Sequence, residues 1–107
     1  MARIRINFTA MWHMSILAGK KICTVRCKRL GDVGDVFPIE DRDFVLTSVE
    51  SMSFFACRNS SVPFDEGIDD VDSFIGIMKS YYSALHDNTT VYVHYFNPIN
   101  NGAPNIN

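Results

Sequence analysis

The sequence predicts a single α+β domain built around a curled, barrel-like β-sheet, with its elements in the order β-α-β-β-β-α-β. Three observations lead to this prediction. A chain of 107 residues suits one domain. Segments in which polar and apolar side chains alternate outnumber the two segments with helical spacing. Turn-forming residues leave short connections between most of these segments.

The N-terminal part of the chain is expected to form a strand followed by a helix. Over Ala2–Thr9, Arg and Asn residues alternate with Ile and Phe residues, which is typical of a half-buried strand. Thr9 can cap a helix over Ala10–Ala18, and Gly19 suits the left-handed residue that ends such a helix. The apolar side of this helix is expected to come mainly from Met11, Met14, Ile16 and Leu17.

Residues 21–26 are expected to form the second strand, and a turn-rich connector follows it. The alternation of a strand places Thr24 and Arg26 on one face and Lys21 on the other. Lys21 and Thr24 can therefore meet only if Lys21 lies in the turn before the strand, or at a bulge.

The rest of the chain is expected to supply the remaining strands and the second helix. These strands are predicted at Val36–Ile39, Phe44–Glu50 and Val91–Phe96. Between them, Cys57–Gly67 has the composition of a loop. Asp69 can cap a helix over Asp70–Ser83, whose apolar residues recur at helical spacing and predict a face packed on the core.

The domain is expected to occupy residues 1–96, with residues 97–107 as a flexible C-terminal tail. The tail is rich in Asn, Pro and Gly and has little apolar surface to bury. No apolar run approaches the ~20 residues that a membrane helix needs, and no apolar signal core follows the first arginines. We therefore expect a cytoplasmic protein that has no membrane partner.

Basic residues concentrate at the start of the chain. Residues 1–30 contain no acid, and all twelve Asp and Glu residues lie at Asp32 or beyond. The basic residues of this segment are Arg3, Arg5, Lys20, Lys21, Arg26, Lys28 and Arg29. Such asymmetry indicates a surface that attracts an anion such as RNA, unless folding mixes the two halves and cancels the field.

The three cysteines do not suggest a metal site. Cys23, Cys27 and Cys57 are odd in number and contain no Cys-x-x-Cys pair. A disulfide framework and a structural zinc site are both disfavoured by this pattern. We expect reduced thiols that are buried or half-buried, and neither a metal nor another cofactor.

Four short motifs occur in a fixed order along the chain. Gly19, Lys21, Thr24 and Arg26 match a Gly-x-Lys-x-x-Thr-x-Arg pattern. A Val-Gly-Asp turn at 33–35, a Glu-Gly-Ile segment at 66–68 and an aromatic-rich strand at 91–96 follow. In this combination the chain resembles the ASCH domain family over residues 6–96. The resemblance implies a fold similar to the PUA domain, an RNA-binding barrel.

The resemblance also implies a function for the first motif. ASCH domains are thought to bind RNA through the cleft that holds it, and some small members look like amidohydrolases that deacetylate acetylcytidine. Carried over by motif, the catalytic groups are Lys21, Thr24 and Glu66, with Asp65 as a neighbouring alternative to Glu66. A threonine hydroxyl needs a base, and a lysine serves as one only when its pKa is lowered. A carboxylic acid can then protonate the leaving amine.

Three functions remain open from the sequence. The favoured one is a binding domain in which Lys20, Arg26, Lys28 and Arg29, together with Lys21, hold RNA or a modified nucleoside. The second is hydrolysis of an acylated nucleoside. The third is a non-catalytic protein-interaction domain whose basic start meets an acidic partner. Without the resemblance, Thr24 and Glu66 are interpreted as ordinary structural residues of a strand and of a helix N-terminus.

Overall fold

The computed structural model describes residues 1–99, which form four strands and four helices. The strands are β1 (Cys23–Arg26), β2 (Val36–Ile39), β3 (Arg42–Ser53) and β4 (Thr90–Pro98). The helices are α1 (Ala10–Leu17), α2 (Phe54–Arg58), α3 (Val62–Asp65) and α4 (Val71–Tyr81). The predicted α+β class and the curled sheet are confirmed.

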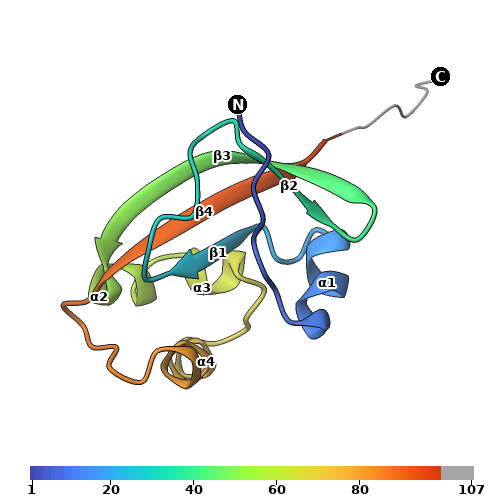
Figure 1. Cartoon of the computed structure of the whole chain (residues 1–107). Coiled ribbons are helices and arrows are strands. Elements are labelled where there is room, and N and C mark those ends of the chain that lie inside the picture. Colours follow the sequence, from blue (N-terminus) through green and yellow to red (C-terminus); the bar gives the residue numbers. More distant parts are fainter. Residues whose placement is uncertain (100–107) are drawn as a thin grey trace.

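The strands form one antiparallel sheet in the order β1-β4-β3-β2. Figure 1 shows β3 and β4 as long curved strands. Their register shifts between Leu46 and Ser48, and such a bulge bends a strand and increases its twist. The sheet therefore curls, as a half-open barrel does. In the view of Figure 1, α2, α3 and α4 lie below the curved strands, and α1 lies beside them.

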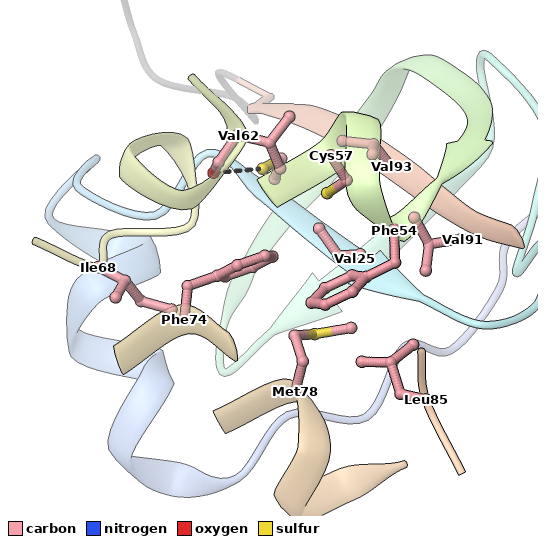
Figure 2. Close-up of a cluster of buried hydrophobic side chains, with 11 residues drawn as sticks. Val25, Phe54, Cys57, Val62, Ile68, Phe74, Met78, Leu85, Val91 and Val93 are labelled. Atoms are coloured by element: carbon pink, nitrogen blue, oxygen red, sulfur yellow. Dashed lines mark hydrogen bonds between the residues drawn. The ribbon is translucent and has the colours of Figure 1, made fainter. Parts of the chain in front are cut away.

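The core has two parts because both faces of the sheet are covered. Val91 and Val93 point to one face and Phe96 to the other, as strand alternation requires. Figure 2 shows the first part, where Val25, Val91 and Val93 of the sheet meet Phe54, Phe74, Met78 and Leu85. The second part contains Ile6, Ile16, Phe37, Phe44, Leu46 and Phe96. Trp12 of α1 packs against both parts and lies at their junction.

The N-terminal segment is not the strand that its alternation predicts. It is joined to the sheet by one isolated bridge, between Arg3 and Val36. After that bridge the segment leaves β2 and crosses toward β1, where the carbonyl of Asn7 accepts a hydrogen bond from Arg26. Its apolar residues Ile4, Ile6 and Phe8 still pack on the core. Alternation reflected burial of one side of the segment, and not pairing along a sheet edge.

Residues 57–67, predicted as loop, contain the last two residues of α2 and all of α3. Ser53 caps α2, because its hydroxyl accepts a hydrogen bond from the Ala56 amide at 3.1 Å. Pro63 lies in the first turn of α3, where backbone N–H groups have no partner within the helix, so its missing N–H costs no hydrogen bond. The predicted count of two helices is therefore wrong: neither helix has the two or three turns that periodicity needs to be visible.

Several boundaries also differ from the prediction. Asp70, and not Asp69, caps α4 through a 2.8 Å hydrogen bond from the Ser73 amide. Met11 and Met14 are exposed, so α1 buries its surface chiefly through Ile16. Strand β4 continues through Pro98, beyond the predicted end of the domain at residue 96. Residues 100–107 of the predicted tail lie outside the described residues.

The three cysteines are free thiols, with Cys23 and Cys57 buried and Cys27 half-buried. Burial raises the pKa of Cys23 and of Cys57 to about 12, so both stay protonated and unreactive at neutral pH. Over residues 1–99, the helices are all too short or too polar to cross a membrane.

Candidate ligand-binding site

A pocket of about 310 Å³ lies between α1 and α4, with β1 at its base. The base carries the side chains of Lys21, Thr24 and Arg26, together with Glu66. One wall is formed by the N-terminal segment and α1, and the other by α4 and the residue that follows it. The wall residues are Asn7, Phe8, Thr9 and Trp12 on the first side, and Phe74, Ile77, Met78, Tyr81 and Tyr82 on the second.

Lys21 reaches this pocket because it lies in the turn before β1. Gly19 has a φ of 77° and ends α1, and the backbone amides of Lys20 and Lys21 then both donate to the Ser15 carbonyl. The regular strand starts only at Cys23. The alternation of β1 therefore does not apply to Lys21, and its side chain joins Thr24 in the pocket.

Glu66 is held in the pocket at the end of α3. Its carboxylate forms a buried ion pair with the ammonium of Lys21, and its other oxygen accepts a 2.7 Å hydrogen bond from the Val25 amide. Gly67 turns the chain directly after it, with a φ of 82°, and a Cβ at Gly67 would lie 3.0 Å from the hydroxyl of Ser15. A close approach of α1 therefore places Glu66 beside Lys21.

Asp65 has a different role. Its side chain accepts a 2.6 Å hydrogen bond from the hydroxyl of Tyr95, and its carbonyl accepts one from the Ile22 amide. It does not line the pocket. The acid beside Lys21 is therefore Glu66, while Asp65 ties α3 to the strands.

Thr24 and Arg26 form a second fixed pair. Arg26 donates from Nε to the Thr24 hydroxyl oxygen at 3.0 Å and from one terminal nitrogen to the Asn7 carbonyl at 2.7 Å. The Phe8 ring lies under the guanidinium, with 5.1 Å from Cζ to the ring centroid. Because Thr24 Oγ1 accepts from Arg26, the Thr24 hydroxyl hydrogen is left for another acceptor.

Burial sets the protonation of the lysine. Lys21 is 3% exposed, and this burial lowers its pKa to about 7, with the charge of Arg26 acting in the same direction. Its ammonium lies 5.1 Å from the ring centroid of Trp12 and 5.7 Å from that of Phe8. Burial likewise lowers the pKa of Arg26. At neutral pH the lysine is therefore able to exchange a proton.

Comparisons with known proteins identify the fold. No family model and no curated protein sequence matches the chain significantly. Among solved structures, the hypothetical protein PH0355 has a TM-score of 0.74 and 16% identity, covering 92% of this chain and 100% of that one. An ASCH domain from Lactobacillus crispatus has a TM-score of 0.69 and 14% identity, over 91% of this chain and 79% of that one. The chain has the fold of an ASCH domain. The protein PF0455 from Pyrococcus furiosus is also similar, with a TM-score of 0.63, 15% identity and coverages of 92% and 98%.

The remaining basic residues that the sequence singled out lie elsewhere on the ASCH fold. Lys20, Lys28 and Arg29 are outside the pocket lining. Arg29 pairs with Asp32, and Arg3 pairs with Asp43. Folding therefore mixes the basic start of the chain with later acids. Of the basic residues proposed to hold RNA or a nucleoside, Lys21 and Arg26 line the pocket.

The aromatic walls of the pocket were not recognised from the sequence. Trp12 lies beside an apolar stripe, which is typical of a core residue, and Tyr81 and Tyr82 end the stripe of α4 without a motif of their own. His94 was also missed: its ring, fully buried, accepts a hydrogen bond from the Leu30 amide and lies 3.2 Å from the Thr24 carbonyl. Over residues 1–99, no three His, Cys, Asp or Glu side chains gather as metal ligands would.

Proposed function

We propose that the pocket binds a single nucleobase, either of a free nucleoside or of an unstacked residue in RNA. The observation that carries this proposal is the pairing of aromatic walls with a fixed arginine fork. Phe8, Trp12, Tyr81 and Tyr82 supply rings around a space of about 310 Å³. Unstacked bases are commonly held against aromatic side chains and hydrogen-bonded along their edges. The volume lies at the lower end of the roughly 300–1,000 Å³ typical of small-molecule sites.

Arg26 supports recognition of a base edge. Its Nε and one terminal nitrogen are held by Thr24 and Asn7, so the guanidinium is already oriented. The other terminal nitrogen keeps its donors for a ligand. A preorganised planar donor of this kind suits a carbonyl or ring nitrogen of a base.

The charge distribution supports a base more than a phosphate in the pocket. Lys21 is already paired with Glu66, and the cations Lys20, Lys28 and Arg29 are outside the lining. The remaining cation of the lining is Arg26, and two of its nitrogens already donate to Thr24 and Asn7, so it could replace little of the hydration of a phosphate. We infer that any RNA backbone runs outside the pocket, over these basic residues.

Hydrolysis of an acylated base is a second candidate, favoured by the lowered pKa of Lys21. Neutral Lys21 would accept the hydroxyl proton of Thr24 while Thr24 Oγ1 attacks the acyl carbon. The C–N bond would then break, and the proton on Lys21 would pass to the leaving amine nitrogen. Water would cleave the resulting ester, releasing acetate and restoring Thr24. Glu66 would orient neutral Lys21 by accepting a hydrogen bond from its amine, and would pair with the ammonium once Lys21 has taken the proton.

Cytidine and acetylcytidine test both candidates. Trp12 is the sole tryptophan of the chain and lines the pocket, so its emission reports a bound ring. We expect a saturable change with cytidine, and cytidine plus acetate from acetylcytidine by chromatography. Thr24→Val should abolish product formation and weaken cytidine binding only in part, because Arg26 loses its Thr24 partner but keeps the hydrogen bond to Asn7. If neither compound changes the emission at millimolar concentration, the base-binding proposal is wrong and a protein-interaction domain is the better account.

A further inference from the structure

The two walls of the pocket are connected at its mouth by one long hydrogen bond. The indole Nε1 of Trp12 in α1 donates to the hydroxyl of Tyr81 in α4 at 3.5 Å. Within residues 1–99, no other side-chain hydrogen bond joins α1 to α4. A hydrogen bond of this length, with water close by, is weak and easily exchanged for hydrogen bonds to solvent.

Tyr81 lies where α4 is least constrained. It is the last residue of the helix, it is 54% exposed, and Tyr82 leaves the helix with a φ of −130° and a ψ of 88°. Met78 is the last deeply buried residue of α4, at 3% exposure. Residues 79–81 are exposed, while Tyr82 and Leu85 beyond them pack on the first part of the core. The exposed turn is therefore held at its two ends and has little packing of its own, and exposed helix ends open more readily than buried segments.

Gly76 weakens the end of α4, although packing does not require a glycine at this position. It is an exposed residue in the interior of α4, and a Cβ built on it would meet no atom within 4 Å. Its φ is not positive, so an alanine would fit without strain. In an α-helix the amide four positions later bonds to the carbonyl, so the Ser80 amide bonds to Gly76, which lies in the turn that leads into Tyr81. Glycine destabilises a helix interior more than any residue except proline.

We propose that Trp12 and Tyr81 control entry to the pocket, and that the last turn of α4 opens as a gate when their hydrogen bond breaks. In the closed state the indole stays over Lys21, 5.1 Å from its ammonium, and the mouth is bridged. In the open state Tyr81 swings away with its turn, and a flat ligand can pass between the two rings. This inference deepens the proposed function. It rests on that function only because a gate needs a ligand that enters the pocket.

Acrylamide quenching of Trp12 in the ligand-free protein tests the gate directly. Tyr81→Phe removes the hydroxyl and keeps the ring, and we expect the quenching constant to rise, by up to about five-fold for the loss of one hydrogen bond. Gly76→Ala should lower it and should slow hydrogen exchange of the amides after Met78. Tyr82→Phe is the matched control, since the hydrogen bond of Trp12 goes to Tyr81 and not to the hydroxyl of Tyr82. Its quenching constant should equal that of the wild-type protein.

The outcomes are distinct. Opposite shifts for Tyr81→Phe and Gly76→Ala support the gate, whether or not cytidine binds. Wild-type quenching in both variants, with their folds intact by circular dichroism, would overturn it. Failure of cytidine to bind the wild-type protein would count against the proposed function alone, because the quenching experiment needs no ligand.

Discussion

Lys21 and Glu66 form an ion pair in which the two side chains are only 4% and 7% exposed. The residues are far apart in the sequence, one in the turn before β1 and the other at the end of α3. The same carboxylate also accepts a hydrogen bond from the Val25 amide, so it joins the lysine to the strand that carries Thr24 and Arg26. The base of the pocket is thus one connected polar unit.

Glu66→Gln is expected to destabilise the protein most at acid pH. Removing one partner of a buried ion pair typically costs about 3–5 kcal/mol, because the other charge is left unpaired. Above pH 7 Lys21 can lose its proton, so the cost should shrink. Asp65→Asn is the control: it weakens one hydrogen bond from Tyr95, which is worth about 1 kcal/mol at any of these pH values. Urea unfolding at pH 6 and pH 8 measures the free energy of unfolding of both variants. If Glu66→Gln and Asp65→Asn lost the same stability, Glu66 would not be the partner of Lys21.

The stability of the wild-type protein is expected to rise between pH 7 and about pH 8.5. Burial lowers the pKa of Lys21 in the folded state to about 7, below its unfolded value of about 10.4. Between pH 7 and about 8.5 the unfolded chain binds more protons through Lys21, so the free energy of unfolding increases with pH, and the burial penalty is fully present below pH 7. Above about pH 8.5 the raised pKa values of Cys23 and Cys57 act in the opposite direction, because the unfolded thiols lose protons that the folded ones keep. The gain is at most about 1.4 kcal/mol per pKa unit.

The double variant Lys21→Met/Glu66→Gln isolates this contribution, because it removes both titrating groups and keeps similar volumes. Its unfolding free energy, measured from pH 6 to about pH 8.5, below the range in which the cysteines titrate in the unfolded chain, should lack the rise that we expect in the wild-type protein. Parallel curves for the two proteins would show that Lys21 titrates at its ordinary value.

Arg26→Lys is expected to weaken cytidine binding by about ten-fold or more. An ammonium cannot reproduce the two directed hydrogen bonds to Thr24 and Asn7, nor the stacking over Phe8. Arg29→Lys is the matched control, since Arg29 pairs with Asp32 outside the pocket. Titrations that follow Trp12 emission measure both. Unchanged affinity in Arg26→Lys would mean that this arginine only supports the fold.

Lys28→Ala combined with Arg29→Ala should separate RNA binding from base binding. Both residues lie outside the pocket, so cytidine affinity should not change. Affinity for single-stranded RNA should fall, and the log-log salt dependence should flatten by roughly 0.7 for each phosphate that is no longer neutralised. Titrations at several salt concentrations decide this. No RNA binding by the wild-type protein at low salt would limit the ligand to a free nucleoside.

Much of the fold could be predicted because local patterns report burial and chain direction. Alternation located β1, β2, β3 and β4, and helical spacing located α4. The same reasoning failed for residues 2–9, because alternation indicates one buried side and says nothing about a pairing partner. It failed for α2 and α3 because helices of five and four residues are shorter than the period that reveals them.

For the site, the sequence by itself determined which groups are present and the order of the motifs that carry them. The tertiary structure alone decided which of them meet. Lys21 shares the pocket with Thr24 because Gly19 ends α1 before the strand begins. Glu66, rather than Asp65, lies beside Lys21 because Gly67 packs against Ser15. The rings of Trp12 and Tyr81 come together only when α1 and α4 dock on the sheet. The physical reason is that short-range patterns encode which side of each segment is buried. Contacts between distant segments depend on how those buried faces pack. They also depend on which basic residues of the N-terminal part pair with acidic residues from later in the chain.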